Sequence, residues 1–238
     1  MDEKSFLAAY DKHQFDAPLT SVDSVLFSYH QECLKLLLVQ RSNHPEQGKW
    51  GLPGGFVDLQ VDQSLEDTAR RILRAKTAID PPYLEQLQTF GNGSRDKRGW
   101  SVTVCYSAMM AYQSCEPHVS SVADVQWVNI DKLDQLPLAF DHGDIIAHAR
   151  ERLKQKALYS IVPAYALPEL FTLPELQHLH ELIIGKPLQK KSFRRRIEQA
   201  ELLIDTGEKV SQKSGRPASL YRMKDRAGSF TFVRNLEE

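Results

Sequence analysis

A glycine-rich stretch followed by an arginine-rich one has the composition of a phosphate-binding site. Residues 49–58 read KWGLPGGFVD, and residues 70–76 read RRILRAK. Backbone amides of a glycine-rich loop can hold phosphate oxygens, and arginine can bind a phosphate through two parallel hydrogen bonds. The residues that could bind phosphate in this way are Gly54, Gly55, Arg71, Arg41 and Arg98.

Three aromatic residues could add a stacking surface for a nucleotide base. Trp50 and Phe56 lie inside the glycine-rich stretch, and Phe90 follows the arginine-rich one. Large aromatic side chains also fill hydrophobic cores, so each of the three could be structural instead. The composition alone indicates a nucleotide-binding region and leaves both roles open for each ring.

Other groupings of potential metal ligands are weak. Asp141, His142, Asp144 and His148 lie close together, but the two histidines are six residues apart and point in different directions on one helix. The simpler interpretation is that a helix begins at this point. We therefore expect no metal site and no arrangement of residues for nucleophilic catalysis.

The sequence also indicates the cellular compartment. The three cysteines are widely spaced and odd in number, which argues against a disulfide framework and fits a reducing environment. No run of 18 or more apolar residues is present, and the N-terminal stretch lacks the apolar segment of a signal peptide. We expect a cytoplasmic protein with no membrane partner.

Strands and two helices are predicted around the glycine-rich stretch. Apolar runs at residues 21–30 and 34–42 are separated by a short polar link and are typical of paired strands. A helix is predicted from the N-cap Ser64 to Lys76, and a second one from Asp141 or His142 toward Leu158. With further strand-like runs at residues 101–112 and 125–130, the pattern predicts an α/β/α sandwich over residues 1–155.

A second, smaller domain is predicted over residues 156–238. Residues 159–170 contain two prolines and little periodicity, so they are expected to be a linker or short connecting turns. A helix ending at Gly185, a short turn and a basic helix over residues 190–204 follow. Two strand-like runs then flank the basic loop SQKSGRP, which completes the pattern of a winged helix-turn-helix.

Charge is distributed unevenly between these two parts. Residues 1–150 carry a net charge of −6, whereas residues 186–234 carry +8, so only the C-terminal end is suited to a polyanion. A basic face exposed to solvent is the alternative explanation. If the polyanion is DNA, Arg194 is a candidate base reader and Lys213 a candidate phosphate contact. The full set of candidate DNA-binding residues is Lys190, Lys191, Ser192, Arg194, Arg195, Arg196, Lys213, Ser214 and Arg216.

The stretch GGFVDLQVDQSLEDTARRILRAKTAI, from Gly54 to Ile79, resembles the Nudix signature, a loop and helix that bind diphosphates. Gly55 matches its first glycine and Arg71 its arginine, an arginine that the resemblance assigns to bracing the loop. The acidic positions differ, because Ile72, Ala75 and Lys76 stand where the family has glutamates. Ala78 replaces a family glycine, and two extra residues separate Gly55 from Arg71, so that Val61 or Gln63 takes the place of the first glutamate.

The C-terminal part is similar to the winged helix of the Nudix-related transcriptional regulators, NrtR. The similarity rests on FTLPELQHLHELIIGKPLQKKSFRRRI and GRPASLYRM, and with the Nudix-like part it covers roughly residues 18–223. The resemblance implies a bacterial repressor of NAD biosynthesis and salvage genes. It also implies a homodimer that binds a palindromic operator and is released by ADP-ribose or a related NAD-derived nucleotide.

Two other functions remain as alternatives. The chain could be a Nudix-type ADP-ribose pyrophosphatase that uses acids outside the degenerate helix; the nearby acids are Asp58, Asp62, Glu66 and Asp67. It could also be an RNA-binding or adaptor protein. Magnesium in proteins is held by oxygen ligands, often carboxylates, and the helix positions that should supply them carry isoleucine, alanine and lysine. We therefore expect a sensor without hydrolase activity and without a cofactor, with ADP-ribose as its effector.

Overall fold

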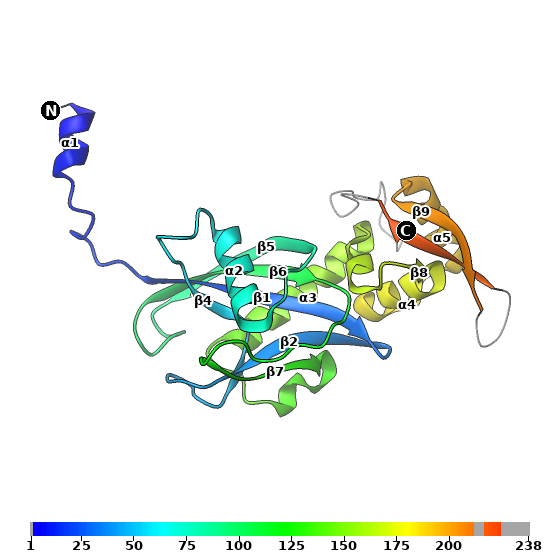
Figure 1. The fold of residues 1–238 in the computed structure, drawn as a ribbon, viewed down its shortest axis with the longest axis horizontal. Coiled ribbons are helices and arrows are strands. Elements are labelled where there is room, and N and C mark those ends of the chain that lie inside the picture. The colour runs from blue at the N-terminus through cyan, green and yellow to red at the C-terminus, as the bar shows by residue number, and fades with distance from the viewer. Residues whose placement is uncertain (1, 212–216, 225–238) are drawn as a thin grey trace.

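The N-terminal part of the chain is built on a seven-stranded mixed sheet, seen in a computed structural model that describes residues 2–211 and 217–224 (Figure 1). Strand β1 lies parallel to β6, and every other strand pair in the sheet is antiparallel. The strands are β1 Leu19–His30, β2 Cys33–Arg41, β3 Trp50–Gly51, β4 Gly54–Phe56, β5 Tyr83–Asn92, β6 Ser101–Met109 and β7 Val122–Asn129.

Strands β1 and β2 form the predicted hairpin. They pair from Phe27↔Leu36 to His30↔Cys33, and the two turn residues Gln31 and Glu32 both have positive φ. Two consecutive residues in this conformation match the right-handed twist of a tight hairpin. Farther from the turn, β1 pairs with β4 and β2 pairs with β3, so the two strands have different partners at their far ends. Along its other edge, β2 pairs with β7 from Lys35 to Arg41.

Helices cover both faces of this sheet, which confirms the predicted α/β/α sandwich (Figure 1). Helix α2, Leu65–Thr77, begins at the predicted N-cap Ser64 and buries Ala69, Ile72 and Leu73 against one face. Helix α3, His142–Tyr159, packs on the other face through Ile145, Ile146, Ala149 and Leu153. A 3₁₀ helix, η1 Ile130–Gln135, precedes α3.

The C-terminal part has the predicted winged helix-turn-helix arrangement. Helix α4, Leu173–Ile184, starts with a capping box between Thr172 and Glu175 and ends at Gly185 in the left-handed conformation. Helix α5, Lys190–Ala200, follows after a short turn. A three-stranded sheet with the order β8-β10-β9 completes the unit, formed by β8 Phe171–Thr172, β9 Leu203–Val210 and β10 Ala218–Met223.

Helix α5 is shorter than predicted. The sequence pattern extends it to Ile204, but the helix ends at Ala200, and Glu201 adopts the left-handed conformation with φ of 53°. Leu203 then starts β9 and pairs with Met223 of β10. The apolar run after Ala200 fits a helix face and a half-buried strand equally well, and pairing with a distant strand decides between them.

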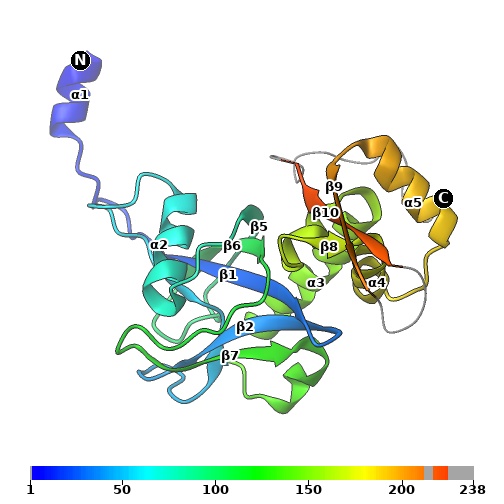
Figure 2. The ribbon, with the colours of Figure 1, turned by 45° about the vertical axis from the view of Figure 1, so that its right-hand side comes forward.

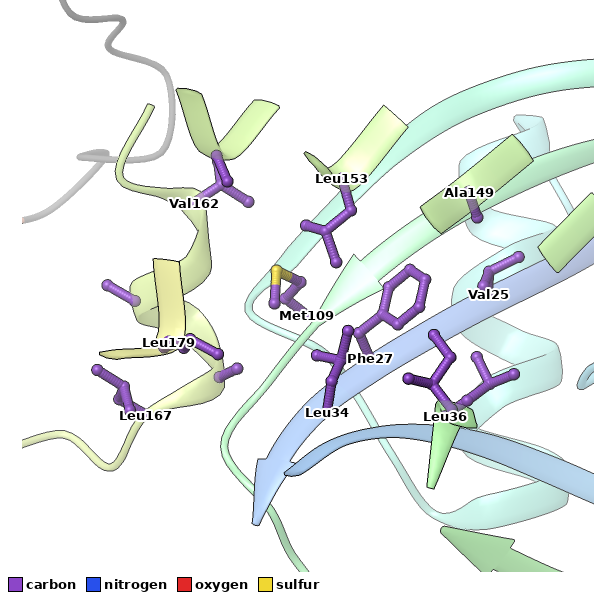
Figure 3. Close-up of a cluster of buried hydrophobic side chains, with 14 of the residues drawn as sticks. Val25, Phe27, Leu34, Leu36, Met109, Ala149, Leu153, Val162, Leu167 and Leu179 are labelled. Carbon is purple, nitrogen blue, oxygen red and sulfur yellow. The ribbon is translucent and has the colours of Figure 1, made fainter. Parts of the chain in front are cut away.

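Of the two alternatives predicted for residues 159–170, short connecting turns are observed and an exposed linker is not. The segment contains a short 3₁₀ helix, η2 Val162–Ala166, and residues 160–164, 166 and 167 are buried, whereas residues 168–170 are exposed. Figure 3 shows Val162, Leu167 and Leu179 facing a cluster that includes Phe27, Leu34 and Met109 of the sheet. The two parts therefore share one hydrophobic core, and α3 runs continuously across the boundary predicted at residue 155.

Several elements were not predicted from the sequence, among them the short strands β3 and β4 in the glycine-rich stretch that was expected to be a loop, and also β5 and α1. Strand β5 is half exposed and carries glutamine and glutamate, so it lacks the apolar character of the strands that were recognised. Helix α1, Glu3–Ala9, buries no residue and lies away from the rest of the chain (Figures 1 and 2). Within the described residues, no helix is long and apolar enough to cross a membrane.

Candidate functional site

A cavity of about 350 Å³ opens where β1 and β2 take different partners. Asp23 from β1 and Arg41 from β2 line it, together with the glycines of the loop before α2. Further lining residues come from the segment before β6 and from the start of α3. The size falls within the range of small-molecule sites, roughly 300–1,000 Å³. The sheet, both helices and the glycine-rich loop thus converge on one pocket.

The buried Asp23 forms the floor of this pocket. Its Oδ2 accepts a hydrogen bond from the Thr103 hydroxyl at 2.7 Å. A Cβ at Gly54 would lie 1.7 Å from its Oδ1, so the loop can approach the carboxylate this closely only with glycine. His142 lies beside them and accepts a hydrogen bond from the Leu52 N–H on its Nδ1, at 2.9 Å. Burial lowers the pKa of His142, which favours the neutral imidazole that this bond requires.

Four cationic side chains line the pocket: Arg41, Lys76, Arg95 and Arg98. Arg95 is held by two 2.9 Å hydrogen bonds to Asp141, and Arg98 pairs with Asp96 at 2.7 Å. Within the described residues, Arg41 and Lys76 have no carboxylate oxygen within 4.0 Å. Burial and the charge of Arg98 lower the pKa of Arg41. The pocket therefore concentrates positive charge that its own carboxylates only partly neutralise, which suits an anionic ligand.

Two phenylalanine rings, each with an arginine guanidinium over its face, also line the pocket. The Arg98 guanidinium lies 5.1 Å from the centroid of Phe56, and the Arg41 guanidinium lies 4.8 Å from that of Phe140. Phe56 is 46 % exposed, so part of its ring is open to a ligand. Rings placed beside phosphate-binding arginines can recognise a nucleotide at both its base and its phosphates.

The α2 side chains at the family's acidic positions do not offer a set of metal ligands. Ile72 is buried, and its Cδ1 lies 3.2 Å from the position that a Cβ on Gly55 would take. Ala75 is exposed and has no polar side-chain atom. Lys76 turns its ammonium toward the loop and donates a hydrogen bond to the Gly54 carbonyl oxygen. In the part of the chain that the structure describes, no group of three or more His, Cys, Asp or Glu residues could hold a metal ion.

The four acids near the loop are engaged elsewhere, and none of them lines the pocket. Asp62 accepts hydrogen bonds from Arg71, from the Thr68 hydroxyl and from the Asp58 N–H. Asp67 binds the N-cap Ser64, and Glu66 pairs with Arg70. Arg71 also donates to the Phe56 carbonyl oxygen, at 3.1 Å. The Arg71–Asp62 pair therefore braces the loop.

The Arg71–Asp62 ion pair that holds the loop should be sensitive to acid. The Arg71 guanidinium holds the pKa of the Asp62 carboxyl well below its usual range. An Asp carboxyl with a lowered folded-state pKa stabilises the fold fully above its unfolded pKa of about 3.9, and this contribution is lost as the pH falls through the folded value. Between about pH 4 and pH 2, Asp62→Asn should therefore show a flatter dependence of melting temperature on pH than the wild type. Asp134→Asn, at an exposed site, serves as the control; equal slopes for Asp62→Asn and wild type would contradict the assignment.

The pocket brings together five of the eight predicted ligand residues, namely Arg41, Gly54, Gly55, Phe56 and Arg98. The other three do not line it. Trp50 is buried in the core with 7 % exposure, Arg71 braces the loop, and Phe90 packs edge-on against His148.

Other pocket residues were not predicted as ligand contacts, among them the charged or titratable Asp23, Lys76, Arg95 and His142. Asp23 is a charged residue inside an otherwise apolar strand, and this interruption of the apolar run was the one feature of the sequence that could have indicated a functional role for it.

The candidate DNA-binding residues of α5 lie on a helix that packs against the core through one face. Phe193 and Ile197 are buried with 2 % exposure each. Lys190, Lys191 and Arg195 are exposed, whereas Ser192, Arg194 and Arg196 are half buried. The side of α5 that lies opposite the core therefore presents Lys191 and Arg195 most openly. Lys213, Ser214 and Arg216 lie outside the described residues.

Comparison with known proteins identifies both parts of the chain. Residues 18–149 match the NUDIX domain, and residues 163–223 match the NrtR DNA-binding winged helix domain. The class that fold and pocket define is thus a Nudix domain joined to a DNA-binding winged helix. A relative from Acinetobacter baylyi, described as an ADPR responsive transcriptional repressor NtrR, is 44 % identical over 99 % of this chain and 94 % of its own. The chain belongs to the NrtR family of Nudix-related regulators.

Solved structures agree with this assignment. Shewanella oneidensis NrtR complexed with a 27mer DNA is 62 % identical, with a TM-score of 0.85 over 91 % of this chain and 99 % of that one. The NUDIX domain of the same protein complexed with ADP ribose is 59 % identical, with a TM-score of 0.63 over 64 % of this chain and 99 % of that one.

Proposed function

We propose that this chain is a transcriptional repressor that leaves its operator when ADP-ribose binds in the pocket. The observation that carries the proposal is a pocket lined by four cations that its carboxylates only partly neutralise, built into the same core as a winged helix with a basic face. The repressor function of the Acinetobacter relative supports it, as do the DNA and ADP-ribose complexes of the Shewanella protein.

The pocket suits ADP-ribose for chemical reasons. The diphosphate of ADP-ribose requires cations, which Arg41, Arg98 and Lys76 supply at the pocket wall beside Gly54 and Gly55. The Phe56 ring offers a partly open face for adenine. We assign the role of ligand contacts to these residues, and we assign a structural role to Trp50, Arg71 and Phe90.

Helix α3 offers a physical route from the pocket to the winged helix. Its N-terminal residue His142 lines the pocket, and the preceding Asp141 holds Arg95. At its C-terminal end α3 is followed by Ser160. The Ser160 carbonyl oxygen lies 3.2 Å from Nε2 of the buried His180 on α4. A ligand that binds two arrangements of this helix with different affinity shifts the population between them. We propose that ADP-ribose favours the arrangement that does not fit the operator.

We take the oligomeric state, the form of the operator and the regulated genes from the family resemblance. We propose a homodimer on a palindromic operator, with half-sites about 34–36 Å apart or a multiple of that distance. The genes controlled would be those of NAD biosynthesis and salvage. Because the operator lies on the bacterial chromosome, we place the repressor in the cytoplasm.

The test is a titration of fluorescently labelled operator DNA at fixed salt concentration, with EDTA, with and without ADP-ribose. We expect tight binding without the nucleotide and a large rise in the dissociation constant with it. A scrambled duplex of the same length and a single-stranded RNA serve as controls. Operator affinity that is unchanged at saturating ADP-ribose both in EDTA and in a parallel titration with excess Mg²⁺ would overturn the effector assignment, and a preference for the RNA would favour the RNA-binding alternative.

We propose further that the chain does not hydrolyse ADP-ribose. Hydrolysis by the alternative route requires acids that reach the diphosphate. The carboxylates of Asp58, Asp62, Glu66 and Asp67 instead accept hydrogen bonds within the loop and at the start of α2. With Mg²⁺ or Mn²⁺ present, product formation should stay far below the order of 1 per second typical of enzymes. Turnover at that rate would restore the pyrophosphatase alternative.

Removal of Arg195 should weaken operator binding. Because Arg195 is exposed on the side of α5 opposite the buried Phe193, we expect it to contact a base edge. Loss of a bidentate arginine–guanine contact costs about 1–3 kcal/mol and relaxes specificity at that base pair. Arg195→Ala should therefore bind operator several-fold to a hundredfold more weakly, as measured by fluorescence anisotropy. Arg150→Ala, an exposed arginine of α3, serves as the control, and equal affinities for Arg195→Ala and wild type would exclude the contact.

A further inference from the structure

The position expected for a divalent cation in this pocket is next to a lysine. The family resemblance places a magnesium site between the glycine-rich loop and α2, at the positions of Ile72, Ala75 and Lys76. An isoleucine and an alanine supply no ligand, and an ammonium repels a divalent cation. The Gly54 carbonyl oxygen, the loop oxygen that faces α2, already accepts a hydrogen bond from the Lys76 Nζ. The residues present therefore do not fit a resident metal ion.

The same residues do fit a fixed positive charge. The Lys76 side chain is half buried and reaches the pocket from α2, next to the loop carbonyl that it binds. The buried Asp23 carboxylate, in contact with Gly54, favours the charged form of Lys76. Burial and the charge of Arg41 oppose it and lower the lysine pKa. A ligand anion placed between Lys76 and Arg41 would relieve both of these costs.

We propose that the Lys76 ammonium takes the place of the divalent cation, so that this pocket binds a nucleoside diphosphate through protein cations alone. The inference rests on the proposed function, because it concerns the same effector site. It adds a consequence that the family resemblance does not contain. Effector binding requires no metal, and Lys76 is the residue that removes the requirement.

The distribution of the other pocket cations supports this assignment. Arg95 and Arg98 are each held by an aspartate, so part of their charge is already neutralised. Arg41 and Lys76, the two pocket cations without a carboxylate within 4.0 Å in the described residues, approach from β2 and from α2. They therefore offer positive charge from two different elements, an arrangement suited to a diphosphate.

The test is calorimetric titration of the full-length chain with ADP-ribose, in EDTA and in excess Mg²⁺. For the wild type we expect equal affinities in the two buffers. Lys76→Gln keeps an N–H donor for the Gly54 carbonyl oxygen but removes the charge, and should weaken binding about tenfold to a hundredfold in EDTA. Lys154→Gln, an exposed lysine of α3, is the matched control and should bind as the wild type does.

A second variant tests the replacement of the metal itself. Lys76→Glu places a carboxylate beside the Gly54 carbonyl oxygen and Asp23, a set of oxygen ligands of the kind that magnesium prefers. Binding of ADP-ribose should fall below detection in EDTA and return in part with Mg²⁺ or Mn²⁺. The far-ultraviolet circular dichroism spectrum of each variant, compared with that of the wild type, shows whether the variant is folded.

The outcomes separate this inference from the proposed function. If the wild type binds ADP-ribose in EDTA and Lys76→Gln binds equally well, the role of Lys76 is overturned and the effector assignment stands. If the wild type binds ADP-ribose only with Mg²⁺, the inference is also overturned, and ADP-ribose remains the assigned effector. If the wild type binds no ADP-ribose in either buffer, the proposed function itself fails.

Discussion

Replacement of Phe193 by alanine should destabilise the protein by about 3–5 kcal/mol and abolish operator binding, because the residue anchors α5. Its side chain is 2 % exposed, and its ring packs edge-on against His180 of α4, with ring centroids 5.3 Å apart. A cavity at this position removes the contact that fixes the basic helix relative to α4. Urea unfolding followed by circular dichroism gives the free energy of unfolding, and anisotropy with labelled operator gives the affinity.

The matched control for this variant is Phe6→Ala. Phe6 lies on α1 and is 52 % exposed, so its removal leaves no buried cavity. We expect a free energy of unfolding within about 0.5 kcal/mol of the wild type. If Phe193→Ala loses less than about 1 kcal/mol and still binds operator as the wild type does, α5 is not positioned through this contact.

Substitution of Gly54 by alanine should weaken the response to ADP-ribose and leave operator binding in place. The new Cβ would lie 1.7 Å from the Asp23 Oδ1 and 3.1 Å from the Val22 carbonyl oxygen. Because Asp23 is buried and bonded to Thr103, its carboxylate has little freedom to move aside. Overpacking of this kind costs about 1–3 kcal/mol, and here it displaces the backbone of β4, which lines the pocket and binds Lys76. Calorimetry should show affinity for ADP-ribose reduced by roughly tenfold or more.

Gly143→Ala provides the control on a neighbouring element. A Cβ at Gly143, on α3 next to His142, would make only an ordinary 3.7 Å contact with Leu138. This variant should bind ADP-ribose and operator as the wild type does, with a small gain in helix stability. Normal ADP-ribose affinity for Gly54→Ala would show that the loop adapts and that its close approach to Asp23 is not required.

The local elements of the fold were predictable because their signals are local. The N-cap Ser64, the apolar stripe of α2 and the left-handed Gly185 are each set by a few consecutive residues. The hairpin of β1 and β2 follows from two apolar runs and a short link. The winged helix was likewise recognisable from the order of short elements and their charge.

The pocket was predictable only in part because its remaining residues meet through long-range pairing. Asp23 and Thr103 are 80 residues apart and become neighbours through the parallel pairing of β1 with β6. Arg95 and Asp141 are 46 residues apart. No spacing rule joins such positions in a single sequence. Similarly, the prolines of residues 159–170 indicated a loop, and burial against the sheet made this segment part of the core.

That shared core limits how the two halves of the protein could be exchanged between relatives. Met109 and Leu34 at the end of the sheet contribute to the same cluster as Val162 and Leu179 next to the winged helix (Figure 3). A winged helix grafted from another regulator would have to bring apolar side chains that match this particular sheet end. Diversification of operator preference is therefore easier through the exposed side of α5 than through replacement of the whole unit. Two different family models match its two parts, but the side chains at their junction pack into one core.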